Sequence, residues 1–254
     1  MAFARYPSLE GAVVLVTGGA SGIGEVIVEE FVKQNAKVAF FDIDDAAAAR
    51  CINRLSRTGA YEPLYWHCDL RSVEELRAAI EAVTGILGPI RNLLNNAAND
   101  TRAPLRDLTV AEWDDMMAVN LRHVAFASQA VAEGMASSGG GSIINFTSPT
   151  FRRKTPNLCA YGAAKAGIEG MTRIMAREYG TVKIRVNAIM PGWILTARQR
   201  ALWLTPEGEE ALIEAQCLKH LVQAEDVARL ALFLSADDSR SVTAQTYIVD
   251  AGLV

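Results

Sequence analysis

The 254-residue sequence predicts an α/β fold built on one doubly wound parallel sheet with helices on both faces. Two observations predict this class. Short runs rich in apolar and β-branched residues alternate with stretches whose apolar residues recur at helical spacing. No Pro- or Ser-rich linker and no shift of composition divides the chain, so we expect a single domain over residues 1–254.

The strands and helices are expected to alternate in order along the chain. Residues 13–17 (VVLVT) form a β-branched apolar run, and a glycine-rich turn separates them from a helical pattern that starts at Ile23. The expected strands are 13–17, 37–41, 63–67, 92–94, 142–145, 185–189 and 245–249. The expected helices are 23–33, 46–55, 73–84, 109–135, 160–179 and 225–235. Such regular alternation favours parallel strands joined by right-handed crossovers.

Two stretches interrupt this alternation. Residues 148–158 contain Pro149, Pro156 and three consecutive basic residues, which indicates a loop. Residues 191–223 follow a strand and are too long for an ordinary connection. Because doubly wound proteins often grip substrates with insertions after strand ends, we expect a substrate lid at about residues 192–222.

Charge and composition limit the function classes. The net charge is −4, and no basic block marks a surface for nucleic acid or anionic lipid, so we expect a small-molecule partner. We expect no signal peptide and no membrane span, because no apolar run approaches the ~20 residues that a span needs. The four cysteines and three histidines are scattered, which favours reduced thiols, no metal site and a cytoplasmic protein.

A glycine-rich turn at residues 17–24 (TGGASGIG) joins the first strand to the first helix. Its glycines let the backbone approach a pyrophosphate, and the helix N-terminus offers free N–H groups and partial positive charge. A tight turn without a ligand is the alternative, because a glycine-rich segment alone is a weak signal.

Asp42 strengthens the first interpretation. It closes the second strand about 24 residues after Gly18, near where a dinucleotide fold places its ribose-binding acid. A carboxylate there accepts hydrogen bonds from both ribose hydroxyls and repels a 2′-phosphate, which favours NAD over NADP. An ordinary strand-end carboxylate in a turn with Asp44 and Asp45 is the alternative.

Tyr161 and Lys165 are four residues apart on an expected helix, so their side chains lie on one face. Oxidation of an alcohol by hydride transfer needs a base for the hydroxyl proton, and a free phenol has a pKa of ~10. An ammonium ~4 Å from the phenolate would lower that pKa by ~3 units. Ser148, at the end of a strand, offers a hydroxyl for the substrate oxygen. The alternative for Tyr161 and Lys165 is a helix-surface pair without a function, and the alternative for Ser148 is a turn cap.

Together these residues resemble the short-chain dehydrogenase/reductase family, which has a Rossmann-type fold. The resemblance extends from about Gly11 to Gly252. Its motifs are residues 17–24, residues 95–98 (NNAA), Asn120, the set Ser148, Tyr161 and Lys165, and the Pro191-Gly192 pair. Ala98 stands where the family usually has Gly.

The resemblance implies a role for each catalytic position. Tyr161 would be the acid/base, and Ser148 would orient and polarise the substrate oxygen. Lys165 would bind the nicotinamide ribose and lower the pKa of Tyr161, while Asn120 would hold a water on a proton path from Lys165 to solvent. The family is commonly tetrameric, which implies a homotetramer.

The resemblance also implies the NAD-binding residues. The adenine would lie between Ile43 and the Asp69-Leu70 pair, and the nicotinamide half would meet Asn96 and Ile194. The full set is Gly18, Ser21, Gly22, Ile23, Gly24, Asp42, Ile43, Asp69, Leu70, Asn96, Tyr161, Lys165, Ile194 and Thr196.

Within the family, several stretches are similar to bacterial sugar 1-dehydrogenases, especially those for D-xylose and L-arabinose, which oxidise the anomeric carbon of an aldopyranose to a lactone. These stretches are 99–102, 117–123, 202–209, 215–219 and 248–252. The candidate sugar contacts are the polar residues Asn99, Asp100, Asn157, Arg198 and Gln199 and the rings of Trp193 and Trp203. Solvated loop residues are the alternative for each polar contact.

Other functions stay open at this point. The basic run at residues 152–154 could attract an acidic substrate or form a solvated charged surface. An NAD(P)H-dependent carbonyl or ketoacyl reductase is a second possibility, although such enzymes usually favour NADPH and Asp42 argues against that. A non-catalytic dinucleotide-binding protein is a third, and the intact Ser148, Tyr161 and Lys165 argue against it.

Overall fold

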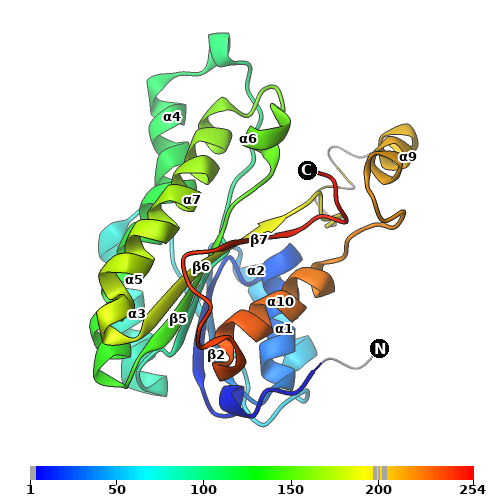
Figure 1. Cartoon of the computed structure of the whole chain (residues 1–254). Coiled ribbons are helices and arrows are strands. Elements are labelled where there is room, and N and C mark those ends of the chain that lie inside the picture. Colours follow the sequence, from blue (N-terminus) through cyan, green and yellow to red (C-terminus); the bar gives the residue numbers. More distant parts are fainter. Residues whose placement is uncertain (1–3, 197–198, 200, 202–204) are drawn as a thin grey trace.

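The computed structural model describes residues 4–196, 199, 201 and 205–254, and a seven-stranded parallel sheet lies at its centre (Figure 1). The strand order is β3-β2-β1-β4-β5-β6-β7. The strands are β1 (Val13–Thr17), β2 (Lys37–Asp42), β3 (Leu64–His67), β4 (Asn92–Asn95), β5 (Gly141–Phe146), β6 (Ile184–Pro191) and β7 (Thr246–Val249). The doubly wound parallel sheet predicted from the sequence is confirmed.

Helices cover both faces of this sheet (Figure 1). One face carries α1 (Gly22–Lys33), α2 (Asp45–Leu55) and α10 (Ala224–Ser235). The other carries α3 (Val73–Leu87), α5 (His123–Ser137) and α7 (Cys159–Tyr179). Each helix turns an apolar stripe toward the sheet. On α1, for example, Ile27 and Phe31 are one turn apart and fully buried.

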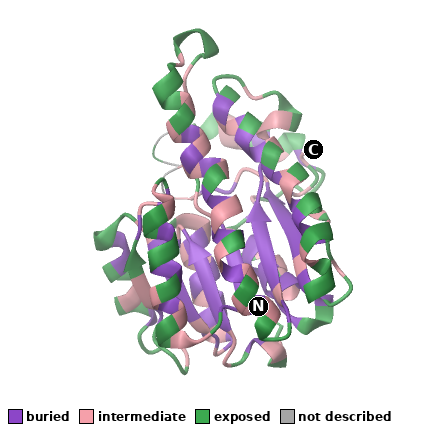
Figure 2. Cartoon of the chain, turned by 90° about the vertical axis from the view of Figure 1, so that its left-hand side faces the viewer, coloured by how far each residue is buried: buried purple, intermediate pink, exposed green. Residues whose placement is uncertain are grey.

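The core is divided into two layers by the sheet. In β1, Val14 and Val16 pack with the helices on one face, while Val13 and Leu15 pack with those on the other. Neither face of the central strands meets water, which explains why their sequences are continuously apolar. Figure 2 shows the central strands buried, with exposed residues on the outward sides of the helices.

The prediction of one continuous helix over residues 109–135 is wrong, because a π-helical turn divides this stretch. The structure has α4 (Val110–Met117), a π-helical turn (Ala118–Arg122) and then α5. The Nδ2 atom of Asn120 donates to the carbonyl of Met116, four residues earlier, at 3.0 Å. A side-chain donor that takes this carbonyl competes with the ordinary backbone ladder, and π-turns of this kind often lie at functional sites.

The two interruptions of the alternation contain short helices. Residues 148–158, predicted as a loop, include α6 (Thr150–Arg153). The long insertion includes α9 (Pro206–Ala215), which Thr205 caps by accepting a hydrogen bond from the Gly208 N–H. Among the residues that the structure describes, no helix has the length and apolar character required to cross a bilayer.

Candidate active site

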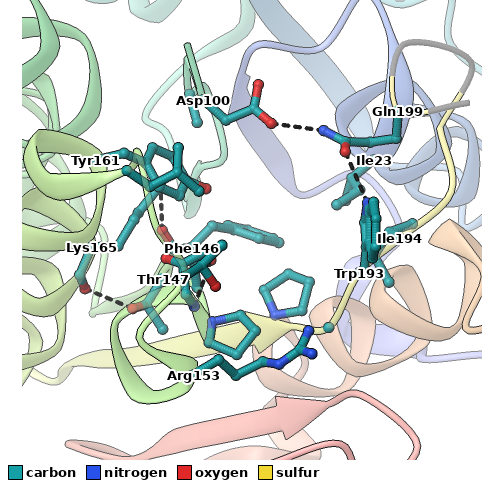
Figure 3. A pocket seen from close by; sticks show the side chains of 18 of the residues that line it. Ile23, Asp100, Phe146, Thr147, Arg153, Tyr161, Lys165, Trp193, Ile194 and Gln199 are labelled. Carbon is teal, nitrogen blue, oxygen red and sulfur yellow. Dashed lines mark hydrogen bonds between the residues drawn. The ribbon is translucent and has the colours of Figure 1, made fainter. Parts of the chain in front are cut away.

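The site lies where the strand order of the sheet reverses. β1 and β4 are neighbours although β2 and β3 separate them in the chain, and ligands of doubly wound sheets bind beyond the carboxyl ends of the strands at such a point. A cavity of about 470 Å³ opens beside this region (Figure 3). Its lining consists of Ile23, Asn96, Ala98, Asp100, Arg102, residues 146–150, residues 153–156, Leu158, Tyr161, Lys165, residues 191–194, Thr196 and Gln199.

The glycine-rich turn packs too tightly for side chains. A Cβ on Gly24 would lie 1.9 Å from the Gly18 carbonyl oxygen, and one on Gly18 would lie 2.8 Å from Cα of Ala97. Asn96 holds the turn from the other side, because its Nδ2 donates to the carbonyls of Thr17 at 3.1 Å and Gly18 at 3.0 Å. The turn therefore presents bare backbone at the positive end of α1, which suits a pyrophosphate.

Asp42 is fixed against this turn. Its Oδ2 accepts a hydrogen bond from the Ala20 N–H at 3.0 Å, and its Oδ1 accepts from Ile43 at 2.8 Å and from Asp44 at 3.2 Å. The strand-end turn considered from the sequence is thus present. The bond to Ala20 also fixes the carboxylate beside the glycine turn, as a ribose-binding acid requires.

The residues expected beside an adenine ring differ in their surroundings. Ile43 is 59% exposed and Leu70 is buried, so Ile43 offers an open apolar surface. The Asp69 carboxylate is already bound by Arg71, whose Nε and Nη2 atoms donate to it at 3.0 and 2.7 Å. This ion pair holds the pKa of Asp69 below its usual value. Arg71 forms a second ion pair, from its Nη1 atom to the Asp115 Oδ1 at 3.0 Å.

Ser148, Tyr161 and Lys165 meet at one wall of the cavity. Ser148 follows β5, while Tyr161 and Lys165 are one turn apart on α7, and the Ser148 side chain is near enough to Tyr161 to lower its pKa. The Lys165 Nζ donates to the Phe146 carbonyl at 2.8 Å and lies 5.6 Å from the centre of the Tyr161 ring. Thr147 joins the same two elements by donating from Oγ1 to the Lys165 carbonyl at 2.6 Å.

Asn120 is buried and bonded within the protein. Its Oδ1 accepts from the Asn99 N–H at 2.9 Å, and its Nδ2 donates to the carbonyls of Asn99 and Met116, each at 3.0 Å. The side chain therefore ties the π-helical turn to the segment that follows β4. Its role in a proton path stays a prediction.

The structure brings some predicted substrate residues together. Trp193 lines the cavity and donates from Nε1 to the Gln199 Oε1 at 2.9 Å, and the Gln199 Nε2 donates to the Asp100 Oδ2 at 2.8 Å (Figure 3). These contacts form a polar chain across one end of the cavity. Arg198 and Trp203 lie outside the described residues.

Two predicted substrate residues do not line the cavity. The Asn99 Oδ1 is used within its own loop, where it accepts from the N–H and the hydroxyl of Thr101. Asn157 is exposed, has a positive φ of 63°, and accepts a hydrogen bond from Ala103 through its backbone carbonyl. Neither residue is part of the cavity lining, and their contact with substrate stays a prediction.

Sequence reasoning missed part of the lining. Phe146 and Thr147 lie at the end of β5 next to Ser148, and Arg102 follows β4. The position of Thr147 beside a catalytic candidate was the only signal that could have placed it. Among the described residues, no three His, Cys, Asp or Glu side chains gather closely enough to hold a metal ion.

Comparison with known sequences adds an independent observation. The family model described as "Enoyl-(Acyl carrier protein) reductase" matches residues 18–254. The chain is 47% identical over 250 residues to "Probable galactose dehydrogenase GalD" of Rhizobium meliloti (strain 1021), covering 98% of this chain and 97% of that protein. It is 46% identical over 252 residues to "D-xylose 1-dehydrogenase" of Caulobacter vibrioides (strain NA1000 / CB15N), covering 99% of each.

Solved structures agree with these matches. A 7α-hydroxysteroid dehydrogenase complexed with NADH and 7-oxo glycochenodeoxycholic acid gives a TM-score of 0.92 at 31% identity, over 99% of this chain and 98% of that one. A short-chain type dehydrogenase/reductase from Mycobacterium ulcerans gives 0.92 at 26% identity, over 98% and 91%. The chain belongs to the short-chain dehydrogenase/reductase family. The resemblance seen in the sequence is confirmed.

As a short-chain dehydrogenase/reductase, the protein is an oxidoreductase that acts on a CH–OH group with NAD or NADP. The residues present fit such a dinucleotide. Gly22 has a φ of +58°, and a Cβ there would lie 3.2 Å from Cγ2 of Thr196, so the space between the helix N-terminus and this threonine is kept open. Ser21 precedes α1 and its side chain makes no cap hydrogen bond.

Burial dominates the electrostatics of the tyrosine–lysine pair. Burial raises the pKa of Tyr161 to about 12, with a further rise from Asp100 and an opposing effect of the Ser148 hydrogen bond. Burial also lowers the pKa of Lys165 to about 7. Lys165 faces the Tyr161 ring and bonds to the Phe146 carbonyl, and its effect on the pKa of Tyr161 stays a prediction.

Proposed function

We propose that this chain is an NAD-dependent sugar 1-dehydrogenase, which moves a hydride from C1 of an aldopyranose to NAD and yields a lactone. The observation that carries the chemistry is the meeting of Tyr161 and Ser148 on the cavity wall, with Lys165 beside the ring. The sugar substrate is supported by the two relatives at 46–47% identity, whose names describe galactose and xylose dehydrogenases.

The chain's own residues account for the movement of the proton. Ser148 holds and polarises the C1 oxygen, and Tyr161 accepts the hydroxyl proton as the C1–H bond breaks. Bound NAD supplies the hydride acceptor and a positively charged ring. Because the pKa of Tyr161 is about 12 without that charge, the phenol is protonated at neutral pH and needs nearby positive charge to act as a base.

Lys165 can support this transfer in two ways. In its charged form it favours the phenolate through its field. With a pKa of about 7 it also exchanges a proton readily near neutral pH, so it can pass the proton onward. Asn120, held against Asn99, would keep the water that continues this path.

Asp42 supports NAD as the coenzyme. Three backbone N–H groups fix its carboxylate beside the glycine turn, where it would accept both ribose hydroxyls. A 2′-phosphate in the same place would meet a like charge at close range. A carbonyl or ketoacyl reductase that used NADPH would face this repulsion.

The other end of the cavity supports a polyhydroxylated substrate. Asp100 and Gln199 offer acceptors and donors in fixed positions, and Trp193 offers an aromatic face beside them. Sugars combine hydroxyl edges with apolar faces, so both kinds of group find partners. The lid at residues 192–222, the homotetramer and the cytoplasmic location stay predictions.

The direct test is a panel of aldoses, polyols, simple alcohols and ketones with NAD and NADP, followed by NADH or NADPH absorbance. We expect turnover of a pentose or hexose with NAD and formation of the lactone or its hydrolysis product. Activity confined to simple alcohols or ketones would reject the sugar assignment. Tight NAD binding without any turnover would favour a non-catalytic binding protein.

A further inference from the structure

Two cations at the edge of the cavity distinguish it from a neutral sugar site. Arg153 and Lys154 line the cavity from the end of α6, five and six residues after Ser148. Among the described residues, neither side chain makes an ion pair or a hydrogen bond. Their neighbour Arg152 behaves differently, because its guanidinium binds the Glu169 carboxylate at 2.9 and 3.1 Å.

Opposite charges therefore line the two ends of the cavity, and Arg102 adds a further cation to its lining. Figure 3 shows Asp100 at one end and Arg153 at the other, with Tyr161 facing the space between them. The Asp100 carboxylate, fixed by Gln199, attracts hydroxyl donors and repels anions. The cationic end has the opposite preference, and a guanidinium binds carboxylate or phosphate with paired hydrogen bonds.

We propose that the substrate is an anionic aldose, which carries a carboxylate or phosphate on the carbon remote from C1. This inference rests on the proposed sugar 1-dehydrogenase function and names the substrate class of that site. The anionic group would lie on Arg153 and Lys154, the hydroxyl edge toward Asp100, and C1 beside Tyr161. Arg153 and Lys154 thus determine specificity and take no part in the proton transfer.

The reaction stays balanced with such a substrate. The C1–H bond delivers its hydride to NAD, the C1 hydroxyl proton goes to Tyr161, and the C1–O bond becomes the lactone carbonyl. The remote carboxylate or phosphate is unchanged. A hexuronate would give the monolactone of a dicarboxylic sugar acid, together with NADH and one proton.

The test compares sugars that differ in the remote group alone. kcat/KM with NAD is measured for D-galactose against D-galacturonate, for D-glucose against D-glucuronate, and for D-glucose 6-phosphate. We expect an anionic sugar to exceed its neutral partner by about tenfold or more, as a charge-assisted hydrogen bond allows. Preference for the uronates would identify a carboxylate as the natural group, and preference for the 6-phosphate would identify a phosphate.

Matched variants place this preference on the proposed residues. Arg153→Gln should lower kcat/KM for the anionic sugar about tenfold or more and leave the neutral partner nearly unchanged. Lys154→Asn, which suits the positive φ of 57° at that position, should act in the same direction. Arg152→Gln is the control and should leave the ratio as in the wild type. Unchanged melting temperatures would establish that the variants fold.

The outcomes distinguish a failure of the anionic-substrate inference from a failure of the proposed sugar dehydrogenase function. A wild-type enzyme that oxidises neutral aldoses as well as their anionic partners would overturn the inference and leave the sugar dehydrogenase intact. Equal losses on both members of a pair in Arg153→Gln would also overturn it. Activity on simple alcohols or ketones with none on any sugar would reject the proposed function, and this inference with it.

Discussion

The Lys165 ammonium donates its hydrogen bond to the carbonyl of Phe146, and so reaches from α7 to the last residue of β5. The same ammonium lies 5.6 Å from the centre of the Tyr161 ring. Lys165, which would assist Tyr161 as the acid/base, therefore also joins the end of β5 to α7. A change at either residue tests both the packing of this junction and its chemistry.

Tyr161→Phe should lower kcat by about 10²- to 10⁴-fold, because the variant loses the group that accepts the substrate proton. The ring and its packing remain, so the NAD dissociation constant should change far less than kcat. The measurement is kcat on the best sugar with NAD, beside a fluorescence titration of NAD. Tyr179→Phe, at the other end of α7, is the control. Undiminished turnover in Tyr161→Phe would contradict the mechanism.

Lys165→Met should change how stability depends on pH. Burial lowers the pKa of Lys165 from 10.5 to about 7, so between these values the unfolded chain binds one more proton than the folded chain. The cost of burying the charge is present below pH 7 and falls as pH rises, by at most about 1.4 kcal/mol per pH unit. Methionine carries no charge and fills similar space.

Urea unfolding of both proteins at pH 7, 8 and 9 measures this effect. The free energy of unfolding of the wild type should rise with pH relative to that of Lys165→Met. The comparison cancels the titration of other groups, including Cys51, whose pKa burial raises to about 11. Parallel pH profiles would mean that Lys165 keeps an ordinary pKa in the folded protein.

Asp42→Ser should shift the coenzyme preference toward NADP. The substitution removes the carboxylate that would repel a 2′-phosphate, and we expect the ratio of kcat/KM for NAD over NADP to fall about tenfold or more. Asp44→Ser is the matched control, since serine can replace Asp44 as the cap of α2 while removing a charge two residues away. Equal shifts in both variants would indicate a general field effect and no contact with the ribose.

Much of the fold could be predicted because it depends on local periodicity. Strands buried on both faces appear as continuous apolar runs, as in β1, and helices appear through their apolar spacing. The positions of Ser148, Tyr161 and Lys165 followed from where those elements end and begin. The π-helical turn could not be predicted from apolar spacing, because it follows from hydrogen bonds of the Asn120 side chain, which contacts Met116 one turn earlier and the distant residue Asn99.

The electrostatics were the least predictable part of the site. The spacing of Tyr161 and Lys165 indicates that they share a helix face but not how deeply the fold buries them, and burial decides both pKa values. The basic run at residues 152–154 was hard to interpret for the same reason, because the sequence does not give the surroundings of each side chain. Sequence alone could not distinguish Arg152, which pairs with Glu169, from Arg153, which lines the cavity.

Gly24→Ala should remove NAD binding and lower stability. The added Cβ would lie 1.9 Å from the Gly18 carbonyl oxygen and 2.6 Å from the Asn96 Nδ2, so the turn must move. Overpacking of this kind costs about 1–3 kcal/mol, and the displaced turn loses its fit to a pyrophosphate.

Gly85→Ala is the control, because Gly85 lies exposed in α3 with nothing within 4 Å of an added Cβ. That variant should bind NAD normally and gain about 0.5–1 kcal/mol, since alanine favours a helix interior. NAD titration and urea unfolding measure both effects, and normal NAD affinity in Gly24→Ala would show that the dinucleotide does not approach this turn.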